Sequence, residues 1–164
     1  MKSVLIALLL SISLIFSSGM TSYAQDFEKG VRAAQSGNFA TAVKEWTALA
    51  EQGNAQAQFG LGVLYANGHG VLKDFKQAAK WYRKAAKQGN AGAQLGLGVL
   101  YANGQGVVKD NAYAHMWLSI AETNGAERAA KNRRKIVTKR MTSSQIAAAQ
   151  KLARECVARE YKGC

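Results

Sequence analysis

Few side chains in this sequence have the types and the spacing that catalysis or metal binding requires. His69 and His115 are the only histidines, and neither stands in a cluster of Cys, Asp or Glu with metal-ligand spacing. The sequence has no Gly-x-Ser-x-Gly motif, and no serine is followed three positions later by lysine, as in the signature of serine β-lactamases. We therefore expect a protein that is not an enzyme, with no catalytic residues, no metal site and no cofactor.

The two cysteines, Cys156 and Cys164, lie close together near the end of the sequence. An even number of cysteines in an exported chain predicts a structural disulfide. Closing so short a loop stabilises a fold by about 2.5 kcal/mol in the chain-entropy model. The alternative is two free thiols or a redox-active pair, although their separation does not resemble Cys-x-x-Cys. We favour a Cys156–Cys164 disulfide.

The first 24 residues have the pattern of a secretory signal peptide. A positive charge at Lys2 precedes an apolar run from Val4 to Phe16, and the stretch ends in Ser22-Tyr23-Ala24. The run is shorter than the roughly 20 apolar residues that span a bilayer. We therefore expect cleavage after Ala24, no transmembrane segment in the mature chain, and export to a bacterial periplasm, with secretion as the alternative.

Positive charge is concentrated near the C-terminus of a chain whose net charge is +12. In an exported protein this charge favours anionic envelope surfaces, such as lipid head groups or lipopolysaccharide, or an acidic protein, and makes nucleic acid an unlikely partner. The alternative is a solvated face that only improves solubility. The candidate basic surface consists of Arg128, Lys131, Arg133, Arg134, Lys135, Lys139 and Arg140.

An internal repeat determines which elements must position these residues. Residues 57–74 and 93–110 are identical at fifteen of eighteen positions, at an offset of 36. In each copy, an uncharged stretch with two glycines inside its expected helix (Gly60 and Gly62 in the first copy) precedes a stretch with apolar residues at helical spacing, which begins after Asp74 or Asp110. A period of this size indicates stacked supersecondary units. The predicted fold class is all-α, a short α-solenoid of stacked antiparallel helix pairs.

The period also divides the chain into parts. We expect a signal peptide at 1–24, an N-terminal tetratricopeptide-like helix pair as a cap at 25–54, repeats at 55–90 and 91–126, and basic C-terminal capping helices at 127–164. Terminal units of a solenoid cover its open ends, so atypical sequence is expected there.

The central copy resembles the Sel-1-like repeat family, a relative of the tetratricopeptide repeats. Leu72 and Val108 depart from the family pattern, which often has proline at this position. The resemblance implies an α-solenoid in which the first helix of each pair lines a concave face. The matching residues are Ala57, Leu61, Gly62, Tyr65, Gly68, Gly70, Val71, Asp74, Ala78, Trp81, Tyr82, Ala85, Ala86, Gly89 and Ala93.

The function predicted from these features is an exported scaffold for protein–protein interaction, which binds a peptide or a helix in its concave face. The candidate groove consists of Phe59, Val63, Leu95 and Val99. The alternative for these four is packing between stacked repeats. Two other functions stay open: binding of anionic envelope surfaces through the basic helices, and the β-lactamase-like or penicillin-binding activity that the resemblance implies for some members.

Overall fold

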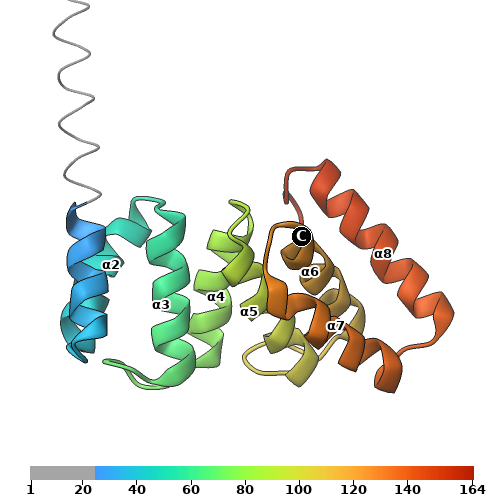
Figure 1. Ribbon diagram of the computed structural model, residues 1–164, viewed down its shortest axis with the longest axis horizontal. Coiled ribbons are helices and arrows are strands. Elements are labelled where there is room, and N and C mark those ends of the chain that lie inside the picture. The colour runs from blue at the N-terminus through green and yellow to red at the C-terminus, as the bar shows by residue number, and fades with distance from the viewer. Residues whose placement is uncertain (1–24) are drawn as a thin grey trace, which may run out of the picture.

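The computed structural model describes residues 25–164, apart from the side chains of Ala130, Arg134, Val137 and Thr138. The predicted signal peptide and its cleavage site lie outside the described residues. Within 25–164 the secondary structure is helical and contains no strand (Figure 1). Residues 25–35 are helical, and the later helices are α2 (Phe39–Glu51), α3 (Ala55–Asn67), α4 (Phe75–Ala86), α5 (Ala91–Asn103), α6 (Asn111–Thr123), α7 (Glu127–Arg140) and α8 (Ser143–Ala158).

The same capping residues begin and end the equivalent helices of the two repeats. The side chains of Asn54 and Asn90 accept a hydrogen bond from the third residue after them, and so cap α3 and α5. Asp74 caps α4 by accepting from two backbone N–H groups, those of Lys76 and Gln77. The first helix of the central repeat ends at Gly68, whose φ of 75° is a left-handed conformation that glycine adopts without strain.

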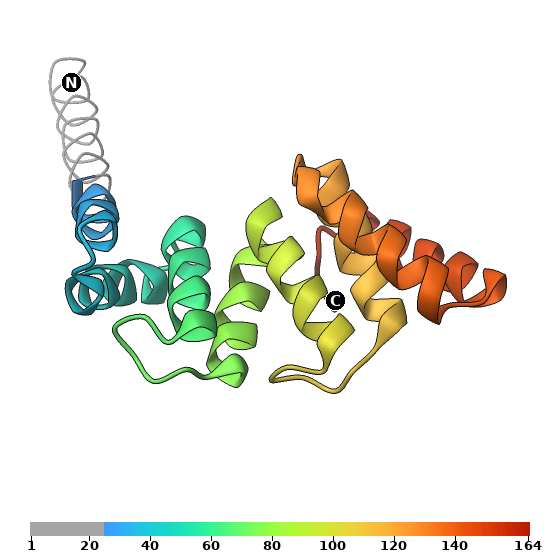
Figure 2. The same ribbon diagram turned by 60° about the horizontal axis from the view of Figure 1, so that its bottom comes forward.

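The helix pairs stack in chain order, with α3 against α4, α5 against α6, and each pair against the next. In Figure 2 the array bends like an arch, and residues 25–35, α3, α5 and α7 lie along its inner side. The side of the array formed by these first helices is named the first-helix face below. The fold is therefore the predicted α-solenoid.

Buried amide side chains fix the register between pairs. Gln58 of α3 donates from Nε2 to the carbonyl of Ala50, and its Oε1 accepts from Gln88, which follows α4. One repeat later, Gln94 donates to Ala86 and accepts from Asn124. Each amide thus adds a hydrogen bond to a carbonyl at the end of the preceding helix, which also accepts from the backbone N–H of Gly53 or Gly89.

The C-terminal helices depart from the simple stack because α7 and α8 both pack against α6. Thr142 and Gln145 form a capping box at the start of α8. The predicted disulfide joins Cys156 to Cys164 and brings the chain end back over α8. Between them Tyr161 accepts a hydrogen bond from Asn124, so the tail is held at the end of α6.

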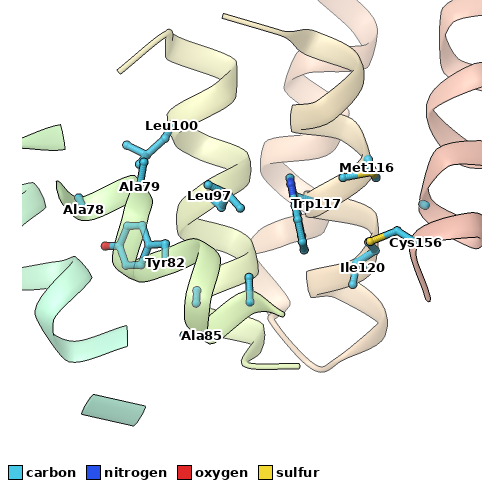
Figure 3. Close-up of a cluster of buried hydrophobic side chains, with 13 residues drawn as sticks. Ala78, Ala79, Tyr82, Ala85, Leu97, Leu100, Met116, Trp117, Ile120 and Cys156 are labelled. Atoms are coloured by element: carbon cyan, nitrogen blue, oxygen red, sulfur yellow. The ribbon is translucent and has the colours of Figure 1, made fainter. Parts of the chain in front are cut away.

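The central core joins four helices through buried alanine, leucine and aromatic side chains. Trp117 lies in the middle of it and is fully buried. Figure 3 shows that these side chains form one cluster, which extends from α4 across α5 to α6 and α8. The labelled members are Ala78, Ala79, Tyr82 and Ala85 of α4, Leu97 and Leu100 of α5, Met116, Trp117 and Ile120 of α6, and Cys156 of α8.

Candidate binding site on the first-helix face

A large open pocket lies at the N-terminal end of the first-helix face. Its volume is about 500 Å³, and its lining is mostly apolar and uncharged. Residues 25–35, α2 and α3 each supply part of the wall, and Phe59 and Val63 of the predicted groove are among the lining residues. We name it the N-terminal pocket; it is lined by Phe27, Val31, Ala34, Phe39, Trp46, Gln56, Phe59, Gly60, Val63, Leu64, His69 and Asn90.

Phe59 has a second role, in packing between the repeats. Its ring lies 6.0 Å from the ring of Tyr82, centroid to centroid. A Cβ added to Gly92 of the next repeat would lie 2.8 Å from the Phe59 ring, so the glycine lets α5 come close. Phe59 is therefore partly buried between repeats and partly exposed to the pocket.

The other two residues of the predicted groove lie elsewhere. Leu95 packs into the core formed with Ala102 and Leu118. Val99 lines a separate, smaller pocket of about 160 Å³ between α5, α6 and α7. Each of the two pockets therefore contains only part of the predicted groove. We name the smaller cavity the basic pocket; it is lined by Val99, Ala102, Asn103, Leu118, Asn132, Lys135, Ile136, Lys139 and Arg140.

The basic pocket brings part of the predicted basic surface to the first-helix face. Lys135 and Lys139 are exposed at its rim, one helical turn apart on α7. Arg140 also lines it, and its guanidinium donates to the carbonyl of Ala102 at 2.8 Å, which ties α7 to the end of α5. A single cavity therefore combines an apolar lining with positive charge.

The remaining basic residues lie outside this pocket. Arg128 and Lys131 are exposed near the start of α7. Arg133 faces α6 and forms an ion pair with Glu122 at 2.8 Å, so its charge is already compensated. The side chain of Arg134 lies outside the described part of the structure.

The size of one side chain at equivalent positions of the repeat explains why one junction between helix pairs is closed and another is hollow. We name the place where α3 and α4 meet α5 the first junction, and the place where α5 and α6 meet α7 the second junction. At the first, Tyr82 lies against Gly62 and Gly96, where an added Cβ would overlap its ring. At the second, the equivalent positions are Leu118, Gly98 and Asn132. The smaller Leu118 leaves the basic pocket open.

The sequence-based prediction used only the repeat spacing and did not compare side-chain volumes at equivalent positions, so it did not reveal this difference in size. Tyr82 and Leu118 differ by one repeat length, and so do Gly96 and Asn132. The signal was therefore available in the same offset that revealed the repeat. Burial of Tyr82 raises the pKa of its hydroxyl to about 12, in agreement with an enclosed ring.

His115 is the one strongly buried histidine among the described residues. Its Nδ1 lies 3.3 Å from the hydroxyl oxygen of Ser119, and its Nε2 has no hydrogen-bond partner. Burial lowers the pKa of His115, the charge of Arg133 lowers it further, and Glu122 acts in the opposite direction. Within residues 25–164 no cluster of His, Cys, Asp and Glu has the arrangement of a metal site. The helices described there include none long and apolar enough to cross a membrane.

The chain is similar to known proteins along most of its length. Residues 55–90 and 91–125 match the Sel1 repeat model. A Sel1 repeat protein from Oxalobacter formigenes is 33% identical with a TM-score of 0.64, over 76% of this chain and 96% of that chain. A protective antigen present in uropathogenic Escherichia coli strains, displaying an SLR fold, is 31% identical with a TM-score of 0.78, over 88% of this chain.

The present chain spans only 32% of that antigen, so the antigen is much longer. No curated protein sequence matches the chain. Both repeats are matched, however, and the Oxalobacter protein is aligned over nearly its whole length. On this evidence the chain belongs to the Sel1 repeat family.

Proposed function

We propose that this chain is an exported scaffold that binds a peptide or a helix of another protein along its first-helix face. The Sel1 repeat fold generally serves as a scaffold for protein–protein interaction. The observation that carries the proposal is the N-terminal pocket, which has a volume of about 500 Å³ and a mostly apolar lining. Grooves of this kind receive the apolar side chains of peptides and amphipathic helices.

The proposal is tested with polar substitutions in the N-terminal pocket. Val31 and Val63 line it and are only partly buried, so Val31→Asn/Val63→Asn should leave the fold intact. We expect this variant to lose the partners that the wild-type chain captures by cross-linking from the envelope, as read by mass spectrometry. Unchanged capture would exclude the pocket as the binding site.

The control removes exposed apolar side chains outside the pocket. Leu72 and Val108 are 91% and 87% exposed in the loops before α4 and α6. Leu72→Asn/Val108→Asn therefore makes the same chemical change at a distance from the pocket lining. This variant should capture partners as the wild type does, because neither Leu72 nor Val108 lines the pocket.

Export is the second part of the proposal. The Cys156–Cys164 disulfide supports it, because disulfides persist mainly in oxidising compartments. The intact mass of protein recovered from the periplasm should correspond to a chain that begins at Gln25. Protein found only in the cytoplasm, with its first residues retained, would contradict export.

A second candidate function is binding to anionic envelope surfaces, and exposed lysine and arginine side chains on α7 favour it. Vesicles that contain phosphatidylglycerol should then bind the protein with an affinity that falls steeply as salt increases. Absent or salt-insensitive binding would exclude this candidate.

A further inference from the structure

The basic pocket has the size of a site for one side chain. Small-molecule sites commonly have volumes of about 300–1,000 Å³, whereas this pocket has about 160 Å³. Its floor is apolar, because Leu118 is 0% exposed and Ala102 and Ile136 are each 6% exposed. The pocket therefore suits a single aliphatic side chain rather than a larger ligand.

Polar and positively charged side chains surround this floor. Lys135 and Lys139 stand one turn apart on the same face of α7, an arrangement that is unfavourable because like charges at this spacing repel. Among the described side chains, no carboxylate lies within 4.0 Å of either ammonium group. Asn103 and Asn132 add amide groups that can bond to a peptide backbone. The rim is thus complementary to negative charge.

We propose that the basic pocket anchors an acidic segment of a partner protein, with one aliphatic side chain on the apolar floor and carboxylates beside Lys135 and Lys139. This inference rests on the proposed function, because it gives the chemistry of a partner that lies along the first-helix face. The lysine repulsion is relieved only when negative charge arrives, which favours acidic segments over neutral ones.

The position of the pocket favours a peptide over a membrane surface. The pocket is lined by residues of α5, α6 and α7. In Figure 2, α5 and α7 lie along the inner side of the arch. A flat bilayer would meet the outer edges of an arch first, whereas an extended chain can follow its inner side. Arg128 and Lys131 are exposed nearer the start of α7 and do not line the pocket.

Short labelled peptides and fluorescence polarisation test the inference directly. The probe is Glu-Glu-Leu-Glu-Glu, and the comparison peptides are Gln-Gln-Leu-Gln-Gln, which lacks charge, and Glu-Glu-Ser-Glu-Glu, which lacks the anchor. We expect the probe to bind the full mature chain more tightly than either comparison peptide. Equal affinity for the probe and the uncharged peptide would overturn the inference.

Two variants locate the binding. Lys135→Glu/Lys139→Glu should weaken probe binding about fivefold or more, since an exposed pair contributes up to about 1 kcal/mol. Arg128→Glu/Lys131→Glu makes the same change in net charge on the same helix and should bind the probe as the wild type does. An equal loss in both variants would mean non-specific charge attraction and would overturn the proposal.

A third variant fills the pocket without altering any charge. Leu118→Phe/Asn132→Gly copies the large ring and the glycine of the first junction, where Tyr82 and Gly96 are in contact. Since burying one aliphatic side chain contributes roughly 1.5–3 kcal/mol, the probe should lose about tenfold or more in affinity. Undiminished binding by this folded variant would overturn the pocket as the anchor site.

The two proposals fail in distinguishable ways. If the Val31→Asn/Val63→Asn variant loses its partners but the probe shows no charge preference, only the acidic-segment inference falls. If neither pocket matters for capture or for peptides, both fall. Vesicle binding that depends equally on all four cations, and not on Leu118→Phe/Asn132→Gly, would overturn the inference in favour of a membrane surface.

Discussion

At the first junction Tyr82 fills the space between α3 and α5, whereas at the second junction Leu118 leaves a cavity between α5 and α7. The first helices α3 and α5 carry no charged residue. The next first helix, α7, brings Lys135 and Lys139 to the cavity rim. Equivalent backbone positions thus hold a closed contact around Tyr82 in one place and an open cavity with lysines at its rim in the next. The difference shows that the repeat fixes where side chains meet, and that their volumes and charges decide what the meeting point can bind.

The largest effect is expected in the core that both junctions share. Trp117 is fully buried, whereas its equivalent Trp81 is 8% exposed and has the ammonium of Lys84 over its ring at 4.3 Å. Trp117→Ala should lower the free energy of unfolding by about 3–5 kcal/mol, and Trp81→Ala by less. Urea unfolding followed by circular dichroism measures both, and equal losses would mean that the two repeats are equivalent in stability.

Removal of the disulfide should loosen α8 at the C-terminal end of the array and leave the first junction unchanged. Cys156→Ser/Cys164→Ser is expected to lower the free energy of unfolding by about 2.5 kcal/mol, since the open chain regains loop entropy when it unfolds. Hydrogen exchange should show lost protection in α8 and retained protection in α3. Uniform loss along the array would contradict this division.

A third substitution turns the first junction into a copy of the second without its lysines. Tyr82→Leu should lower the free energy of unfolding by about 1–2 kcal/mol, less than a complete aromatic truncation, because part of the side chain remains. Urea unfolding measures this cost. The variant should gain no preference for the acidic probe, and a gain would show that the cavity alone selects acidic segments.

The smallest effect concerns pH and lies beside the second junction, where His115 faces Ser119 and Arg133. Because the folded chain lowers the pKa of His115, the unfolded chain binds the proton more readily. The contribution of neutral His115 to the free energy of unfolding is therefore complete above about pH 6.5. It is lost as the pH falls through the pKa that His115 has in the folded chain.

Unfolding measured at several pH values should show this decline in the wild type and a weaker decline in His115→Asn. His69→Asn is the control, because it leaves His115 in place. A decline of the same size in the wild type and in His115→Asn would assign the pH dependence to other groups.

The helices, their caps and the disulfide followed from local sequence. Asn54 and Asp74 cap helices because their short side chains reach the backbone of the same segment. The pairing of Cys156 with Cys164 needed only two cysteines close in sequence. Such features depend on a few neighbouring residues, and the offset of 36 then repeats them along the chain.

The candidate site depended on distant contacts and was predicted only in part. Phe59 and Val63 line the N-terminal pocket, but Leu95 packs into a core with Leu118, because α7 and α8 cover that end differently from a regular repeat. The meeting of Val99 with Lys135 and Lys139 was not foreseen, since nothing in the periodicity of α5 indicates how closely α7 approaches. Spacing within a helix does not reveal the packing of helices that are far apart in sequence.

The amide contacts of Gln58 and Gln94 restrict how such an array can change in length. Gln58 accepts from Gln88, and Gln94 accepts from Asn124, so each donor lies 30 residues further along the chain. Insertion of one whole unit would supply a new acceptor and a new donor together, whereas a partial insertion would leave a buried amide without its partner. Duplication during evolution, or the design of longer versions, should therefore proceed in steps of a complete repeat.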